Sequence, residues 1–223
     1  MMRRCVAEAI GTFSLVFAGT GAIIIDDVSH GAVTHVGIAI TFGLVVMAMI
    51  YAVGDISGAH LNCAVTIGFW LARRLPGRFV VPYILSQIIG AFTASATLRL
   101  MFTNKMMLGT TVPAGSPFQS FILETILSAM LMFVILCVSS GSKEKGTMAG
   151  IAIGGVIAFE AMFAGPISGA SMNPARSIAP AIVSGHLASL WVYIAGPILG
   201  AAMVAPLHRW MRADRIPENR ISE

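Results

Sequence analysis

The sequence predicts an all-α membrane protein with six transmembrane helices and two re-entrant half-helices that enter the bilayer without crossing it. Hydrophobic residues make up 57% of its 223 residues, and charged residues only 11%. A soluble domain carries about 25% charged residues, so this chain has too little charge to cover a water-facing surface. Its 23 glycines fit closely packed membrane helices. An internal repeat, described below, supplies the two half-helices.

Six apolar stretches are long enough to cross a bilayer, which takes about 20 helical residues. We interpret the first as a retained span, because it is longer than the apolar core of a signal sequence and further spans follow it. The segment from His208 to Glu223 is charged, and we expect it to fray. The six predicted spans cover residues 5–25, 33–54, 79–101, 118–140, 147–165 and 187–207.

The placement of basic residues predicts the orientation. An even number of spans puts both termini on one side of the membrane, and most basic residues fall on that side. By the positive-inside rule both termini are cytoplasmic, and we expect the protein in the cell (inner) membrane. Only Arg99, Lys105 and Arg176 fall elsewhere. The residues on the side of the termini are Arg3, Arg4, Arg73, Arg74, Arg78, Lys143, Lys145, Arg209, Arg212, Arg215 and Arg220.

Two semi-polar stretches, 54–74 and 165–185, are too short to cross and resemble each other. Residues 56–64 and 167–175 are identical at six of nine positions, 111 residues apart. Each half of the chain therefore has three spans and one short segment, so the second half is inverted relative to the first. Inverted repeats place interrupted helices near the bilayer midplane. We expect a single domain over 1–223, with repeats of about 1–101 and 118–210 and a cytoplasmic tail over 211–223.

The two short stretches each contain Ser-Gly-Ala-x-x-Asn-[Pro/Cys]-Ala, and these motifs resemble the aquaporin, or major intrinsic protein, family. The run from Phe163 to Ser177 is especially similar to nodulin-26-like members. The resemblance covers nearly the whole chain and implies a six-helix channel assembled as a homotetramer with one pore in each subunit. Its motif residues are Asn62, Cys63, Ala64, Asn173, Pro174 and Ala175.

The chemistry of Asn62 and Asn173 follows from their position at the start of a half-helix. Backbone amides there lack intrahelical partners, and each helix N-terminus presents about half a positive charge. Water or a neutral hydroxyl compound can accept hydrogen bonds from the asparagine amides, whereas cations are repelled. A single Asn-Pro-Ala is more simply an ordinary helix start, but two copies in inverted repeats favour a pore.

Cys63 departs from the family's proline. We expect a plain substitution that keeps the pore and places the thiol beside the constriction. The alternative is a reactive thiol, because a helix N-terminus lowers the pKa of a cysteine.

A narrow selectivity filter is expected on the outer side of the asparagines. Arg176 is a positive charge deep in the membrane, and such residues mark ion or solute pathways. Its position matches the family's filter arginine; the alternative is an arginine that snorkels to the interface. The resemblance adds Phe42, Ala161 and Ala170. Because two alanines add little bulk, we expect a wide opening, unless these alanines only pack helices.

Glu8 and Glu124 are predicted carboxylates within the membrane, one in each half. The resemblance makes them structural acceptors for backbone amides of the re-entrant loops, and the alternative is proton coupling. Glu160 and Asp55 remain unassigned, although Glu160 could face the pore. The scattered cysteines Cys5, Cys63 and Cys137 predict neither a disulfide framework nor a metal site.

The sequence therefore predicts a passive channel for water and small uncharged solutes such as glycerol, urea or metalloid acids, with ions and protons excluded. A water-selective channel is the first alternative, and a proton-coupled secondary transporter is the second. An enzyme is the weakest interpretation, because no nucleophile–base pair, metal cluster or phosphate loop is visible. We expect no cofactor, no metal and no nucleic-acid partner.

Overall fold

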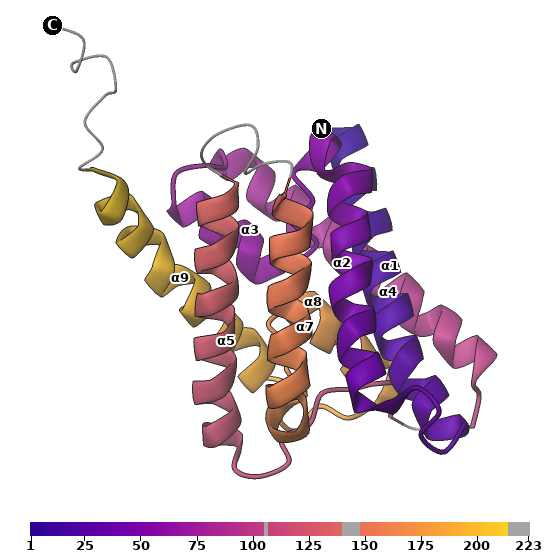
Figure 1. Cartoon of the computed structure of the whole chain (residues 1–223). Helices are drawn as coiled ribbons and strands as arrows, with labels where there is room; N and C mark the ends of the chain where they lie inside the picture. Colours follow the sequence, from indigo (N-terminus) through magenta and orange to yellow (C-terminus); the bar gives the residue numbers. More distant parts are fainter. Residues whose placement is uncertain (105–106, 140–147, 214–223) are drawn as a thin grey trace, which may run out of the picture.

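The computed structural model describes residues 1–104, 107–139 and 148–213. Over these residues the chain forms eight α-helices and one 3-10 turn, and no β-strand (Figure 1). The elements are α1 (Met2–Val28), α2 (Thr34–Ser57), α3 (Cys63–Leu71), η1 (Gly77–Phe79), α4 (Val80–Met101), α5 (Pro117–Val138), α7 (Ala149–Ser168), α8 (Pro174–Ser184) and α9 (Val192–Ala213).

Six of these elements are the membrane spans, close to the predicted ranges. Five are both long and apolar enough to cross a bilayer: α1, α2, the continuous segment Gly77–Met101, α5 and α7. The sixth, α9, has 22 residues but is less uniformly apolar, because it contains two prolines and ends in basic residues. It packs against α5 along the bundle, in the way that α4 packs against α1.

The predicted fraying from His208 onward is wrong for the first part of that segment. Helix α9 continues to Ala213, and His208 is buried against the bundle, so packing still supports the helix there. The rest of the predicted tail, 214–223, lies outside the described residues. So do Lys105 and most of the predicted hairpin over 139–145, with Lys143 and Lys145.

Helices α2 and α7 each run three residues further than predicted, to Ser57 and Ser168. The prediction ended each at the first glycine of the motif region. Both helices instead stop where the next glycine adopts a left-handed backbone, Gly58 with φ 90° and Gly169 with φ 84°. Glycine adopts this conformation without a Cβ penalty and is the common end of a helix.

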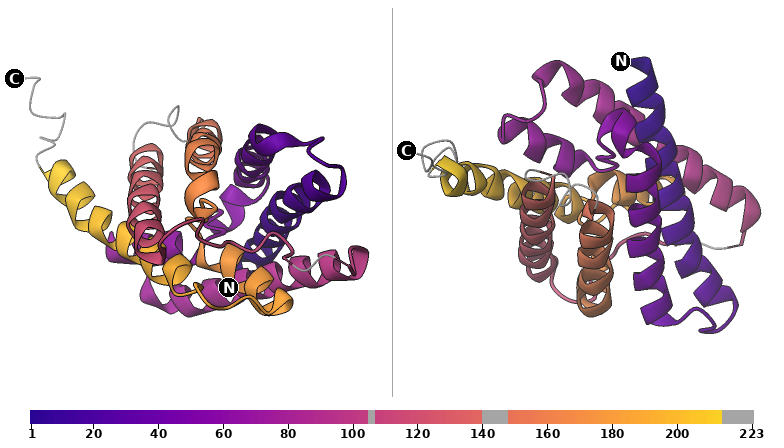
Figure 2. Two further views of the ribbon diagram at one scale, coloured as in Figure 1. Left: turned by 90° about the horizontal axis from the view of Figure 1, so that it is seen from below. Right: turned by 45° about the horizontal axis from the view of Figure 1, so that its top comes forward.

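The internal repeat is visible in the packing of the helices. Helix α1 packs on α4, α5 packs on α9, and α2 meets α7 between the halves (Figures 1 and 2). Equivalent glycines allow the first two contacts. A Cβ on Gly90 of α4 would overlap the carbonyl of Ala9, and a Cβ on Gly200 of α9 would overlap the carbonyl of Thr125. Both pairs of helices therefore approach at backbone distance.

The half-helices α3 and α8 lie inside this bundle (Figure 1). With 9 and 11 residues, they are too short to cross a bilayer at a rise of about 1.5 Å per residue. In Figure 1 the N-terminus and the end of α9 lie toward the same end of the bundle, as an even number of spans requires.

Candidate functional site

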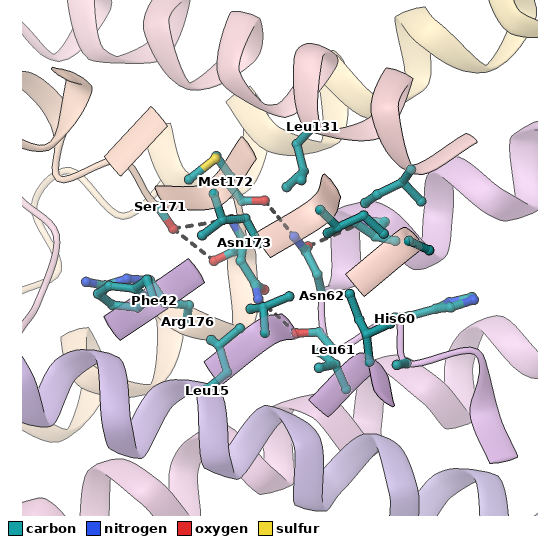
Figure 3. A pocket seen from close by; sticks show the side chains of 18 of the residues that line it. Leu15, Phe42, His60, Leu61, Asn62, Leu131, Ser171, Met172, Asn173 and Arg176 are labelled. Atoms are coloured by element: carbon teal, nitrogen blue, oxygen red, sulfur yellow. Dashed lines mark hydrogen bonds between the residues drawn. The ribbon is translucent and has the colours of Figure 1, made fainter. Parts of the chain in front are cut away.

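The two motif asparagines start the half-helices and bind each other's loop. Asn62 and Asn173 have extended backbones, and each side-chain oxygen accepts a hydrogen bond from the amide two residues on, at 2.8 and 3.0 Å. Each Nδ2 donates across the molecule: Asn62 to the carbonyl of Met172, and Asn173 to that of Leu61, both at 2.8 Å (Figure 3). The N-terminal ends of α3 and α8 therefore meet.

The loops before the half-helices have an unusual backbone, and it is the same in both. Ala59 and Leu61 have φ of 46° and 52°, and Ala170 and Met172 have φ of 41° and 54°. Non-glycine residues adopt positive φ only where the surrounding structure enforces it. Alternate residues turned in this way aim successive amides at one side of the loop, where an acceptor has to meet them.

Glu8 is that acceptor in the first half. Its carboxylate is fully buried and accepts four hydrogen bonds, from the hydroxyl of Ser57, the amides of His60 and Leu61, and the side chain of Gln87. The lengths are 2.7 to 2.9 Å. In hydrocarbon every backbone polar group must be satisfied internally, and Glu8 satisfies two of them.

Glu124 repeats this arrangement in the second half. It is also fully buried, and it accepts hydrogen bonds from the hydroxyl of Ser168 and the amides of Ser171 and Met172, at 2.8 to 2.9 Å. The repeat seen in the sequence is therefore also present in the individual hydrogen bonds of the two carboxylates.

Two tyrosines in equivalent positions of the two halves brace the same loops. The hydroxyl of Tyr83 donates to the carbonyl of Ser57 at 2.8 Å, and that of Tyr193 donates to the carbonyl of Ser168 at 2.7 Å. Both rings are fully buried. Each tyrosine holds the last carbonyl of a spanning helix, α2 or α7, where no intrahelical donor follows.

A cavity of about 120 Å³ runs past the two asparagines. All four predicted filter residues line it, together with both asparagines. Its wall is otherwise mainly apolar. The described residues that line it include Leu15, Phe42, Val46, His60, Leu61, Asn62, Phe69, Leu131, Ala161, Ala170, Ser171, Met172, Asn173 and Arg176.

Arg176 is fixed on two sides within this wall. Its side chain is 2% exposed, and Nη1 donates to the carbonyl of Gly109 at 2.8 Å. Its guanidinium carbon lies 5.0 Å from the centroid of the Phe42 ring, a cation–π contact (Figure 3). Phe42 and Arg176 are therefore neighbours in the cavity wall, which Ala161 and Ala170 also line.

Among the residues of the site that sequence reasoning missed, His60 and Gly109 make specific contacts. His60 lines the cavity, with its ring stacked on Phe69 at 4.6 Å and its Nδ1 3.1 Å from the hydroxyl of Thr66. Its position inside the first motif is the sequence feature that could have identified it as a lining residue. Gly109 lies in the loop between α4 and α5, in a left-handed conformation packed on Thr20. Nothing in the sequence links that loop to Arg176.

One sequence expectation needs correction, and two carboxylates that the sequence left unassigned can be placed. Cys63 is 4% exposed and is absent from the described residues that line the cavity, so its thiol does not lie in the pore wall as expected. It is the first residue of α3, and its side chain packs in the core. Glu160 does not face the cavity either. It is fully buried, and neither of its oxygens has a hydrogen-bond partner within the described part of the chain. Asp55 lies on the exposed surface of α2.

Comparisons with known proteins agree with this architecture. The solved aquaglyceroporin from Plasmodium falciparum superposes with a TM-score of 0.82 over 94% of this chain and 99% of that one, at 24% identity, which establishes the fold. Aquaporin NIP1-1 from Zea mays is 45% identical over the whole chain and 79% of its own length. Nodulin-26 from Glycine max is 42% identical over 95% of the chain and 78% of its own length.

The model of the major intrinsic protein family matches residues 1–208, which contain both half-helices, five of the spans and most of α9. The chain therefore belongs to the major intrinsic protein family, whose members are channels for water and small solutes and not enzymes.

Proposed function

We propose that the protein is a passive channel for water and for uncharged solutes of the size of glycerol or urea, including neutral metalloid acids such as arsenous acid. The observation that carries this proposal is the composition of the cavity wall. One path passes the paired asparagines Asn62 and Asn173, a buried arginine stacked on Phe42, and two alanines.

The size of the opening supports solutes larger than water. Ala161 and Ala170 contribute only methyl groups to the wall, so these two side chains add little bulk and no polar atom. The cavity of about 120 Å³ is well above the roughly 10–15 Å³ that a single water molecule needs, so it holds several waters. A small polyol can therefore exchange several waters for contacts with the guanidinium and the aromatic ring.

The same path opposes ions. The N-terminal ends of α3 and α8 meet at the asparagines, and each carries about half a positive charge. Arg176 adds a full charge in a site sheltered from water. A cation, hydronium included, would lose its hydration and meet this field, whereas a neutral solute meets hydrogen-bond donors.

The coupled-transporter alternative would need a carboxylate that takes up and releases protons along the path. Glu8 and Glu124 are occupied by loop amides, and Glu160 lies outside the cavity lining. These contacts favour structural roles. Flux through reconstituted vesicles should therefore be the same with and without a protonophore, and flux that requires a proton gradient would overturn the proposal.

The water-selective alternative differs from this proposal only in the width of the filter. It predicts fast osmotic water flux with no acceleration of glycerol, urea or arsenous acid entry. Stopped-flow light scattering on the same vesicles, with each solute in turn, separates the two channel types.

We further propose a homotetramer with one pore in each subunit, in a cell membrane with both termini on the cytoplasmic side. Basic side chains at the terminal end of the bundle, such as Arg3, Arg73 and Arg209, support the orientation through the positive-inside rule. Native mass spectrometry of the detergent-solubilised protein tests the assembly; a monomer as the main species would contradict it. Protease access to an N-terminal epitope in sealed spheroplasts tests the orientation.

A further inference from the structure

A histidine on α2 binds a backbone carbonyl of α7 that a proline deprives of its partner. Pro166 lies inside α7 and has no N–H to donate to the carbonyl of Met162, four residues earlier. The Nε2 atom of His35, in the first turn of α2, lies 2.7 Å from that carbonyl oxygen. Because a carbonyl oxygen can only accept, this nitrogen carries the proton and donates. His35 therefore replaces, from another helix, the hydrogen bond that Pro166 removes.

Gly165 makes room for the ring of His35. A Cβ on Gly165 would overlap Cε1 of that ring, so the imidazole packs directly on the backbone of α7. Gly165 and Pro166 are adjacent in the chain. One admits the ring and the other frees the carbonyl, so two neighbouring residues of α7 allow the same contact with α2.

The contact lies at one end of the interface between α2 and α7. The two helices run antiparallel and pack along their length (Figure 1). Nearer the middle, a Cβ on Gly43 would overlap the carbonyl of Gly154, and a Cβ on Gly154 would overlap that of Gly43, so the two backbones touch. His35 and Met162 meet eight residues from this point on each helix, about 12 Å along the axes. The helices are therefore joined by the glycine contact and again by His35.

Two of the predicted filter residues lie between these two contacts. Phe42 precedes Gly43 on α2, and Ala161 precedes Met162 on α7, and the side chains of Phe42 and Ala161 both line the cavity. Each helix contributes further residues to the lining, so α2 and α7 are parts of one wall. If the two helices separated at the end where His35 lies, the opening would widen.

We propose that His35 is a positioning residue for the filter, which holds α7 against α2 through the carbonyl of Met162 and so limits the width of the opening. His35 acts through the two helices and not on the solute, because it is absent from the described residues that line the cavity. The inference rests on the proposed function for the choice of glycerol as the probe.

Stopped-flow light scattering on proteoliposomes of the full chain tests this role. His35→Leu removes the donor and should raise the ratio of glycerol to water flux by roughly twofold, the factor that the lower end of one net hydrogen bond represents. His35→Gln should keep the wild-type ratio, because its side-chain amide can donate to the same carbonyl. An unchanged ratio in His35→Leu, even with a lower midpoint of thermal unfolding, would overturn the proposal, since a purely structural contact affects stability alone.

The variant Pro166→Ala tests whether the effect passes through the carbonyl of Met162. Alanine at this position returns a backbone N–H to that carbonyl. In the Pro166→Ala background, His35→Leu should therefore leave the flux ratio unchanged. A rise as large as in the wild-type background would show that His35 acts by another route and would overturn the proposal.

The matched control is His186→Leu, the same substitution at the end of the bundle opposite the termini. The Nδ1 atom of His186 lies 3.2 Å from the hydroxyl of Ser184, a contact within one short segment of the chain. This variant should keep the wild-type ratio, and an equal rise would overturn the specific role of His35. Wild-type vesicles that exclude glycerol would contradict the proposed function, whereas the positioning role would still predict more glycerol entry in His35→Leu than in wild type.

Discussion

Asn62 and Asn173 each donate a hydrogen bond to the backbone carbonyl of the residue that precedes the other, at 2.8 Å in both directions. Each asparagine therefore caps its own half-helix with Oδ1 and ties down the opposite loop with one N–H of its amide. Each amide has a second N–H, which we propose as the donor to a passing solute. Neither half can form this centre alone, which is the physical reason for two copies of the motif.

Glu124 accepts hydrogen bonds from its loop, whereas Glu160 has no hydrogen-bond partner among the described residues. Substitution by Gln should therefore affect the two positions differently. Glu124→Gln turns one acceptor oxygen into a donor facing the loop, and an unsatisfied buried donor costs about 1–3 kcal/mol. Glu160→Gln breaks no hydrogen bond among the described residues. Thermal unfolding in detergent should show a clearly lower midpoint for Glu124→Gln and little change for Glu160→Gln. Equal losses would contradict the assignment of Glu124 as a loop acceptor.

Cys63→Pro should preserve the channel and slightly stabilise it. Cys63 is the first helical residue, where proline fits, and Asn62 before it has the extended backbone that proline requires, with φ −154° and ψ 125°. We expect a gain of about 0.4–1 kcal/mol and unchanged water flux. A large loss of flux would show that the thiol has a role in permeation.

Thiol reagents provide a separate test of the position of Cys63. Because its buried thiol is not in the cavity lining, a charged methanethiosulfonate reagent should leave wild-type flux unchanged. Ala161→Cys, which puts a thiol in the wall, should become sensitive. If the reagent inhibits wild-type flux and Cys63→Ser abolishes that inhibition, the thiol of Cys63 lies in the pore after all.

Gly19 sets the position of the filter phenylalanine. A Cβ at Gly19 would overlap the ring of Phe42, so Gly19→Ala should push that ring toward the opening and lower glycerol flux more than water flux. The control is Gly155→Ala, on an exposed turn of α7 where a Cβ meets nothing within 4 Å. It should behave as wild type in both assays, and equal flux in the two variants would remove Phe42 from the filter.

Arg176 should be required for the exclusion of cations. Arg176→Val removes the buried charge and its contact with Phe42, and leaves the carbonyl of Gly109 facing the path. In planar bilayers the wild type should carry no measurable proton current, whereas the variant should carry one. A variant that also carries no proton current would show that the half-helices alone exclude protons.

The sequence predicted the spans and the central motifs because each depends on local pattern. Apolar length locates a span, and the repeated motif locates Asn62 and Asn173. It could not place Cys63 and Glu160 relative to the cavity, since neighbouring residues of one helix can face the pore or the core. It also missed Gly109, whose contact with Arg176 joins residues 67 positions apart through a loop without a motif.

The permeability ratio of glycerol to water most directly tests the central claim that the filter passes neutral solutes larger than water. Stopped-flow light scattering on proteoliposomes should show fast entry of both for the wild type. Ala161→His, which adds bulk and a hydrogen-bond partner to the cavity wall, should lower the ratio while keeping water flux. Wild-type vesicles that pass water rapidly but exclude glycerol, urea and arsenous acid would contradict the account.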